Sequence, residues 1–361
     1  MRPVTVLVFH PQTGDSGPRE RLVESARLAL AGSLRSGFLS AGADEVRIVT
    51  GPPDDLSFGD RLRRAAAGLG GGIVVLGSGA IPLASAADLR RFVEIAAGPA
   101  GHALANSRFS ADIVAIADAA VVASIPAIAG DNGLPRWLAE AAGLRVADMA
   151  NRWRLQVDID SPLDLVLAAR HPGCPAPIRE RANAALAEPD LATLTATIAG
   201  VAAVMGDPRG ELVIAGRTSA ATLRWLERNA RCRVRAIVEE RGMRAAGSSN
   251  RRPPRSILGY ALDNSGPGDL AARLGELGDA AIVDSRVLLA HRLGAEASGW
   301  PPAEDRFASD LLEPRSIADP WLRALTESAA GGHLPVLLGG HSLVGPGVRL
   351  LQPRSLGSGR G

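Results

Sequence analysis

The stretch Gly72-Ile-Val-Val-Leu-Gly-Ser-Gly-Ala-Ile-Pro-Leu83 decides the fold of the first half of the chain. Ile73 to Leu76 is a short, β-branched apolar run, which predicts a buried strand. The glycines and the proline after it predict a tight turn, and Ser85 is placed to cap a helix that extends to Ala97. A strand, a turn and a helix in this order are typical of α/β proteins.

The same alternation continues on both sides of this stretch. Strands are expected at residues 4–9, 46–50, 112–117 and 154–159, and helices at 19–34, 56–69, 135–142 and after Ser161-Pro162. This order predicts an α/β fold with a mainly parallel, doubly wound sheet. Ligands of such sheets bind beyond the carboxyl ends of the strands, so we expect the site at the loops 10–18, 77–83 and 158–161.

A chain of 361 residues is long for a single hydrophobic core, which favours two domains. The pattern breaks at His171-Pro-Gly-Cys-Pro-Ala-Pro177, which is typical of a linker. The sequence therefore predicts a first domain at 1–172, a helical linker at 173–210 and a second, smaller α/β domain at 211–352. In the second domain, strands are expected at 211–215, 233–239, 280–283 and 334–338.

All 40 basic residues are arginine, because the chain contains no lysine. A phosphate-binding lysine, a Schiff-base lysine and a lysine general base are therefore excluded. Any anionic ligand must be held by arginine, backbone amides, helix N-termini or a metal ion. The arginines are spread along the chain without an aromatic-interleaved basic stripe, so the sequence does not favour nucleic-acid binding.

The apolar runs of the sequence are only as long as strands, whereas a membrane span needs roughly 20 residues. The first residues lack the long apolar segment of a signal peptide. Cys174 and Cys232 do not indicate a disulfide framework. We therefore expect a cytoplasmic protein that does not associate with a membrane.

Three segments of the first half, taken together, resemble one known family. They are Ala41-Gly-Ala-Asp-Glu-Val-Arg-Ile-Val-Thr50, the stretch 72–83 with the following Ala87-Asp-Leu89, and Val157-Asp-Ile-Asp-Ser-Pro-Leu-Asp-Leu165. In their order and spacing they are similar to segments of the nucleotidyltransferases of the molybdenum cofactor guanylyltransferase and 2-phospho-L-lactate guanylyltransferase type. The resemblance covers only the first half and implies a sheet like that of the nucleotide-diphospho-sugar transferases.

The resemblance also implies an activity. Members of this family bind a nucleoside triphosphate and transfer its nucleotidyl group to a small acceptor, usually with Mg²⁺. Asp158 and Asp160, on one face of the expected strand, are then the catalytic carboxylates that hold the metal. The alternative is that one of the two only caps the next helix. The second half would supply an acceptor pocket or an interface between copies of the chain.

Two positions depart from the family pattern. The family's usual aspartate before Pro-Leu corresponds to Ala80, so one metal ligand is missing. The family's first loop commonly carries a lysine, which this chain lacks. We expect Arg19 to replace it as the catalytic cation, with the amides of residues 14–17 forming an anion nest.

The expected nucleotide-binding residues follow the early strands. They are His10, Thr13, Gly14, Ser78, Gly79, Asn106, Ser107 and Arg108. The donors of residues 106–108 suit a base or a phosphate, and Gly79 lets a ligand approach the backbone closely. Ordinary turns, and a strand-end histidine satisfied by the backbone, explain the same residues without a ligand.

Two alternative functions stay open at this point. Ala80 favours a nucleotide-binding, regulatory relative whose catalysis is altered. Asp158-Ile-Asp160 also satisfies the Asp-x-Asp pattern of glycosyltransferases that use nucleotide sugars, although its place late in the domain argues against this. No cysteine and histidine spacing indicates a zinc site, and no Gly-x-Ser-x-Gly indicates a serine hydrolase.

Overall fold

The computed structural model describes residues 2–12, 14, 16–51, 54–188, 191–243 and 252–352. The chain divides into two compact units. The first comprises Met1–Asp160 and Ala168–Ala182, and the second comprises Ser161–Leu167 and Asn183–Gly361. Each unit has its own sheet, and each is described by itself below.

The first unit is built on a six-stranded sheet. Its strands are β1 (Val4–Pro11), β2 (Glu45–Gly51), β3 (Gly72–Gly77), β4 (His102–Ala105), β5 (Ile113–Ile116) and β6 (Arg145–Asp148). Their order is β2-β1-β3-β5-β4-β6, and only β5 runs antiparallel to its neighbours. The prediction of an α/β fold with a mainly parallel sheet is confirmed.

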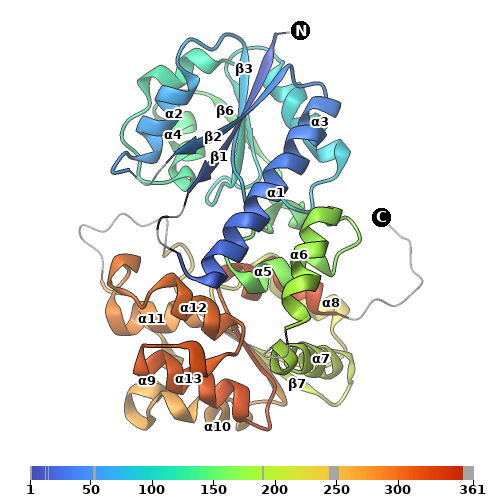
Figure 1. The fold of residues 1–361 in the computed structure, drawn as a ribbon, viewed down its shortest axis with the longest axis vertical. Coiled ribbons are helices and arrows are strands. Elements are labelled where there is room, and N and C mark those ends of the chain that lie inside the picture. The colour runs from blue at the N-terminus through green and yellow to red at the C-terminus, as the bar shows by residue number, and fades with distance from the viewer. Residues whose placement is uncertain are drawn as a thin grey trace. The chain divides into compact units, whose positions relative to one another are not determined.

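Helices cover both faces of this sheet (Figure 1). Helices α1 (Pro18–Ser40) and α3 (Ala86–Ala96) pack on one face, and α2 (Phe58–Ala66) and α4 (Leu134–Glu140) lie on the other. The core between α2, α4 and the sheet includes Leu62, Leu138 and Ile73, all fully buried. As expected, Ser85 caps α3, because its hydroxyl accepts a hydrogen bond from the Asp88 amide at 3.2 Å.

Residues 154–159, which were expected to form a strand, do not form one. Trp153–Gln156 is a 3-10 helix, and Asp158 makes only an isolated antiparallel bridge with Ala80. The Asn106 side-chain amide donates to the Leu155 carbonyl at 2.7 Å, and the Gln156 side-chain amide donates to the Asn106 carbonyl at 2.8 Å. Side-chain hydrogen bonds thus replace a strand ladder, and the expected strand face shared by Asp158 and Asp160 is absent.

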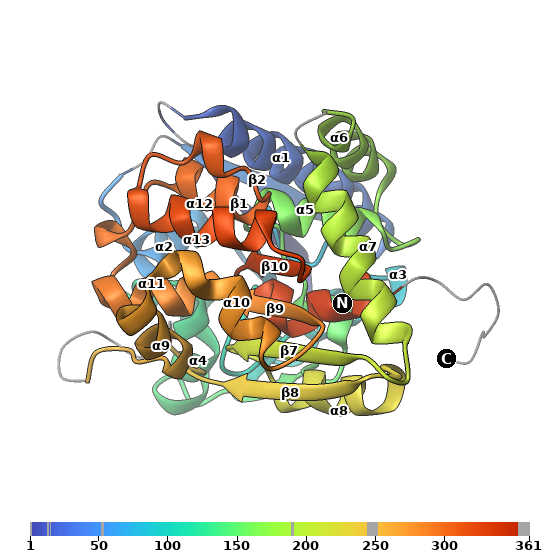
Figure 2. The same ribbon diagram turned by 90° about the horizontal axis from the view of Figure 1, so that it is seen from below.

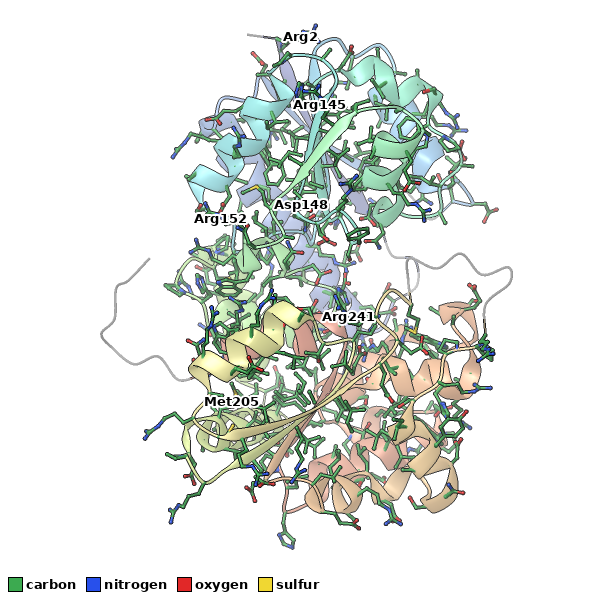
Figure 3. The ribbon with its side chains drawn as sticks, turned by 180° about the vertical axis from the view of Figure 1, so that it is seen from behind. Arg2, Arg145, Asp148, Arg152, Met205 and Arg241 are labelled. Carbon is green, nitrogen blue, oxygen red and sulfur yellow. The ribbon has the colours of Figure 1, made fainter. Side chains whose placement is uncertain are left out.

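Strands β4 and β6 were not predicted. Each has only four residues, which is too short for a clear alternation of polar and apolar side chains. Strand β6 lies at the edge of the sheet, and Figure 3 shows the charged Arg145 and Asp148 at its two ends. Exposed charges of this kind suit an edge strand, because they discourage pairing with another chain.

The second unit is built on a four-stranded, all-parallel sheet (Figure 2). Its strands are β7 (Glu211–Gly216), β8 (Arg233–Val238), β9 (Ala280–Asp284) and β10 (Val336–Gly339). The order is β10-β9-β7-β8. All four lie where strands were predicted, and the second α/β unit is thereby confirmed. Strand β9 is buried along its whole length, which explains its uninterrupted apolar run.

Helices precede, connect and follow the strands of the second unit. They are α5 (Pro162–Ala169, of which residues 162–167 belong here), α7 (Ala192–Gly206), α8 (Ala220–Asn229), α9 (Ile257–Ser265), α10 (Leu270–Gly275), α11 (Ser285–Leu293), α12 (Ala303–Asp310), α13 (Pro320–Gly331) and α14 (Val348–Leu351). Helix α7 packs across β7, β9 and β10. The predicted linker 173–210 thus contains α6 (Ala176–Leu186) and α7. Within the described ranges, none of the helices combines the length and apolar character that crossing a membrane requires.

Gly72, at the start of β3, offers a test of the first unit's packing. A Cβ atom there would lie 1.9 Å from the Ala96 carbonyl oxygen, which is backbone and cannot give way freely. We expect Gly72→Ala to lower the free energy of unfolding by about 1–3 kcal/mol in chemical denaturation. Gly70→Ala is the matched control, because a Cβ at Gly70 meets nothing within 4 Å. Equal stability of the two variants would contradict the packing described here.

Candidate functional site

A cavity of about 560 Å³ opens in the first unit where its strands end. The last residues of β1, β2 and β3 line it, and so does the start of β5, which runs in the opposite direction. This is the edge at which ligands of open α/β sheets bind. The cavity is therefore the candidate functional site.

One wall of the cavity is apolar. Phe9 and Phe58 contribute it together with Val49 and Leu56. The rings of Phe9 and Phe58 lie 5.9 Å apart at an interplanar angle of 58°, so they form a tilted aromatic pair. A wall of this kind favours a flat, weakly polar group such as a nucleobase.

The polar side of the cavity is organised by Arg27 on α1. Its Nε donates to the Ile159 carbonyl at 2.6 Å, and its Nη2 donates to Asp160 Oδ1 at 2.7 Å. The two side chains are only 27% and 37% exposed, so this ion pair is screened less than one on the open surface. Arg27 thus helps to hold residues 159 and 160, which belong to no helix or strand, beside the cavity.

The turn after β3 packs directly against this ion pair. A Cβ atom at Gly79 would lie 2.8 Å from the Ile159 carbonyl oxygen and 3.0 Å from Arg27 Nε, so only glycine fits there without a shift. The Ile159 amide donates to the Gly79 carbonyl at 2.9 Å. The next residue of the turn, Ala80, forms the isolated bridge with Asp158, which is buried.

The side chain of Ser78, in the same turn, is hydrogen-bonded to His10. The hydroxyl of Ser78 and Nδ1 of His10 are 2.9 Å apart, and both residues are buried. Burial lowers the pKa of His10 below its ordinary value of 6.5; Glu24 opposes this shift in part, and Arg27 adds to it. His10 is therefore neutral near pH 7, and its imidazole holds the Ser78 hydroxyl, which lines the cavity.

Asp112 enters the cavity from the start of β5, and Asn106 holds it there. The Asn106 side-chain amide donates to Asp112 Oδ2 at 2.8 Å, and its carbonyl oxygen accepts from the Asp112 backbone amide at 3.0 Å. Asn106 itself is completely buried. Because Asn106 binds both the side chain and the backbone amide of Asp112, it fixes the position of the Asp112 carboxylate.

A second ion pair lies at the rim. Arg61 donates to Asp54 Oδ1 through Nη2 at 2.6 Å and through Nε at 2.9 Å. The hydrogen bonds from Arg61 lower the pKa of Asp54, and Arg64 contributes by its charge. Both side chains are about two-fifths exposed, at 38% and 43%, so the pair remains open to exchange with a ligand.

The structure brings four of the expected site residues together at the cavity: Ser78, Gly79, Asp158 and Asp160. His10 and Asn106 are buried beside it and act through Ser78 and Asp112. Arg19, Gly14, Ser107 and Arg108 are not among the residues that line the cavity. The Ser107 hydroxyl accepts from the amide of Ser110 at 3.2 Å, as in an ordinary turn. Thr13 lies outside the described residues.

Sequence reasoning missed Arg27, Asp112 and the aromatic pair Phe9 and Phe58. Arg27 lies in the middle of a helix and is 133 residues from its partner Asp160, so no local motif marks it. Asp112 and Phe9 were assigned to strands, and their positions at the ends of β5 and β1 are the signal that was available.

Two features reduce the oxygen donors available to the magnesium ion that the sequence predicts at Asp158 and Asp160. Among the residues that the structure describes, no group of three or more His, Cys, Asp or Glu side chains is arranged to hold a metal. Asp160, one of the two expected ligands, already receives a hydrogen bond from Arg27, and Ala80 beside Asp158 offers only a methyl group. The cavity offers a ligand arginine, carboxylate and backbone groups instead.

No protein-family model matches the chain, and a search of curated proteins finds no match. The geometry of the cavity therefore carries the functional inference.

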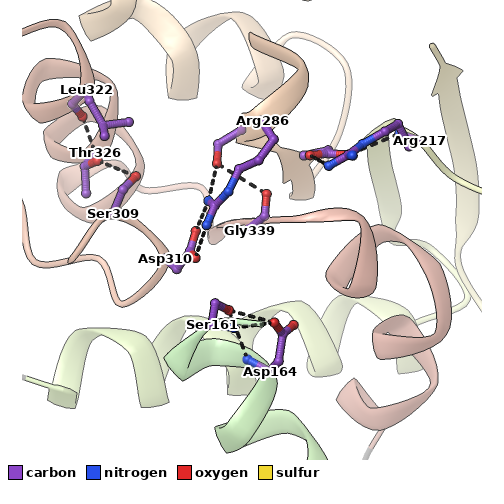
Figure 4. A network of polar contacts seen from close by, with 11 residues as sticks. Ser161, Asp164, Arg217, Arg286, Ser309, Asp310, Leu322, Thr326 and Gly339 are labelled. Atoms are coloured by element: carbon purple, nitrogen blue, oxygen red, sulfur yellow. Dashed lines mark hydrogen bonds and ion pairs between the residues drawn. The ribbon is translucent and has the colours of Figure 1, made fainter. Parts of the chain in front are cut away.

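The second unit has a buried charged network at the carboxyl ends of its own strands (Figure 4). Arg217, after β7, donates to both oxygens of Asp284 at the end of β9, at 2.6 and 2.9 Å. Arg286 forms a similar fork with Asp310, and its Nη1 also donates to the Ser285 hydroxyl at 2.9 Å. Burial lowers and Asp310 raises the pKa of Arg286; the net shift is upward, so the guanidinium stays charged.

The lowered pKa of His10 predicts a pH dependence of stability. The folded state disfavours the protonated imidazole of His10. The free energy of unfolding is therefore unaffected by His10 above pH 6.5, where the imidazole is neutral in both states. It decreases as the pH falls below 6.5 towards the lower folded-state pKa, because the unfolded chain takes up the proton first. We expect His10→Asn to reduce the loss of unfolding free energy between neutral and acidic pH. His333→Asn, an exposed histidine, should leave the loss as it is in the wild type. Urea titrations across this pH range measure both, and an unchanged slope in His10→Asn would show that His10 is not responsible.

The fork between Arg286 and Asp310 predicts a large cost of removing one partner. Arg286→Met leaves the completely buried Asp310 carboxylate unpaired, and we expect a loss of about 3–5 kcal/mol in unfolding free energy. Arg273→Met is the matched control, because the Arg273–Glu276 pair is exposed and should contribute less than about 1 kcal/mol. Chemical denaturation followed by circular dichroism compares the two variants. A loss in Arg286→Met no greater than in the control would be evidence that the fork contributes little.

Proposed function

We propose that the first unit binds a nucleotide in the cavity at the carboxyl ends of β1, β2 and β3. The observation that carries this proposal is the combination, in one cavity of about 560 Å³, of an aromatic wall, a glycine-containing turn and arginines. A nucleotide needs an apolar surface for its base and cationic or amide donors for its phosphate. The resemblance of three segments to nucleotidyltransferases supports the same ligand class.

The base contacts the apolar wall in this proposal. Phe9 and Phe58 present aromatic carbon to the cavity, and every nucleobase has a flat face that packs on such a ring. Asp54 and Asp131 lie on the same cavity and accept hydrogen bonds from sugar hydroxyls or from the amino groups of a base.

The phosphate lies against the turn after β3. Gly77 lines the cavity, and a Cβ atom at this position would meet nothing within 4 Å. A ligand therefore approaches the backbone of the turn directly, which side chains would prevent. Arg27 lies beside this turn and supplies the cationic donor that the chain, without lysine, cannot draw from an ammonium group.

Isothermal titration calorimetry of the full chain with nucleoside mono-, di- and triphosphates of the four bases tests this proposal. Saturable binding of at least one nucleotide is the expected result. Pyrophosphate release is measured on the same samples with phosphorylated acceptors, because its appearance would add nucleotidyl transfer to binding. Absence of binding for every nucleotide would exclude the proposed function.

Phe58 provides a specific prediction for the bound base. Phe58→Leu keeps an apolar side chain but removes the aromatic face. Replacing a stacked ring by alanine costs about 1–3 kcal/mol, which is about 5- to 150-fold in affinity, and leucine keeps part of the apolar contact, so we expect nucleotide affinity to fall about 5- to 50-fold. Phe109→Leu is the matched control, because Phe109 is 77% exposed and does not line the cavity. Calorimetry on both variants measures the difference.

Gly77→Val complements this pair of variants. A Cβ atom at this position would meet nothing within 4 Å, and the valine side chain occupies room that the phosphate needs; thermal unfolding establishes that the variant is folded. Unaltered affinity in both Phe58→Leu and Gly77→Val would place the nucleotide elsewhere.

A further inference from the structure

The contacts of Arg27 bear on how the cavity neutralises a phosphate. Its guanidinium binds one carbonyl oxygen, of Ile159, and one carboxylate oxygen, of Asp160, at 2.6 and 2.7 Å. Carboxylate and carbonyl oxygens are the hard donors that a divalent cation would otherwise take. A permanently charged side chain therefore already occupies the Ile159 carbonyl and one carboxylate oxygen of Asp160.

We infer that Arg27 takes the place of a divalent cation at this site, so that the first unit binds a nucleoside monophosphate without magnesium in preference to a magnesium-bound triphosphate. This inference rests on the proposed function. It specifies the charge of the ligand and the source of the neutralising charge, which the proposed function leaves undefined.

Packing holds the guanidinium in this position. Gly79 leaves room for it, because a Cβ atom there would lie 3.0 Å from Arg27 Nε. The Ile159 amide donates to the Gly79 carbonyl, so the acceptor segment is tied to the turn and not only to Arg27. A cation ligated by Asp160 would have to displace a guanidinium that the turn, the helix and the segment all contact.

The balance of charge favours a ligand with few negative charges. Three arginines and five aspartates line the cavity, and Arg27 is paired with Asp160 and Arg61 with Asp54, so the arginines add no excess of positive charge. A triphosphate needs several such charges, supplied in many enzymes by metal ions. A guanidinium has five N–H donors, and two of those of Arg27 serve Ile159 and Asp160. Its remaining donors match the oxygens of a single phosphate group.

Calorimetry of the wild-type chain separates this inference from the function on which it rests. Nucleoside monophosphates and triphosphates are titrated in EDTA and again in excess Mg²⁺. The expected result is that the monophosphate binds with an affinity that changes less than about twofold between the two buffers. Triphosphate binding that is tighter and requires Mg²⁺ would overturn the inference and leave the proposed function standing. If no nucleotide binds in either buffer, both fail.

A metal-binding measurement tests the role of Arg27 without any nucleotide. Arg27→Gln removes the guanidinium charge beside Asp160, so we expect the affinity for Mn²⁺, followed by electron paramagnetic resonance, to rise about tenfold over the wild type. Arg35→Gln is the matched control, since Arg35 is an exposed arginine of the same helix. Equal Mn²⁺ affinity in the wild type and Arg27→Gln would overturn the inference.

Asp160→Asn completes this set of variants. It removes the carboxylate that Arg27 neutralises, so Mn²⁺ affinity should not rise above that of the wild type. Thermal unfolding establishes which variants are folded. If Arg27→Gln is not folded, the comparison of the wild type in EDTA and in Mg²⁺ still decides the inference.

Discussion

The cavity of the first unit depends on the hydrogen bonds that Arg27 makes with Ile159 and Asp160. Residues 154–160 form no strand, so no ladder of backbone hydrogen bonds holds them at the sheet. Arg27 supplies two charge-assisted hydrogen bonds to this segment, and Gly79 makes room for them. The segment is also tied to the turn after β3 by the hydrogen bond from the Ile159 amide to the Gly79 carbonyl, so Arg27 adds to a backbone contact that already places Asp158 and Asp160.

Much of the architecture was predictable, since buried strands such as β3 and β9 are uninterrupted apolar runs with clear boundaries. Helix α3 was predictable from Ser85, whose side chain caps it. The prediction failed at residues 154–159, where the composition suits a strand but hydrogen bonds from the distant Asn106 decide the local structure. Long-range side-chain bonds of this kind leave no trace in local periodicity.

The candidate site was predictable only in part, for a related reason. Ser78, Gly79, Asp158 and Asp160 follow recognisable strands or motifs, and the rule that ligands bind at strand ends placed them together. The cationic residue of the site was harder to predict. Arg19 was chosen because it follows the glycine-containing first loop, but Arg27, two turns further along α1, is the arginine of this helix that lines the cavity. Helical periodicity predicts on which face of α1 an arginine lies, but the segment that this face contacts is far away in the sequence and is known only from the fold.

Each unit has an ion pair between an arginine and an aspartate near the ends of its strands, with different consequences. In the second unit, Arg217 and Asp284 are 7% and 0% exposed, so separating them would leave a charge in a medium that cannot solvate it. In the first unit, Arg27 and Asp160 border a cavity and keep about a third of their surface exposed. In the proposed binding mode, a ligand phosphate would accept hydrogen bonds from the donors of Arg27 that Ile159 and Asp160 do not use. Burial thus distinguishes an ion pair that stabilises a fold from one that is suited to binding.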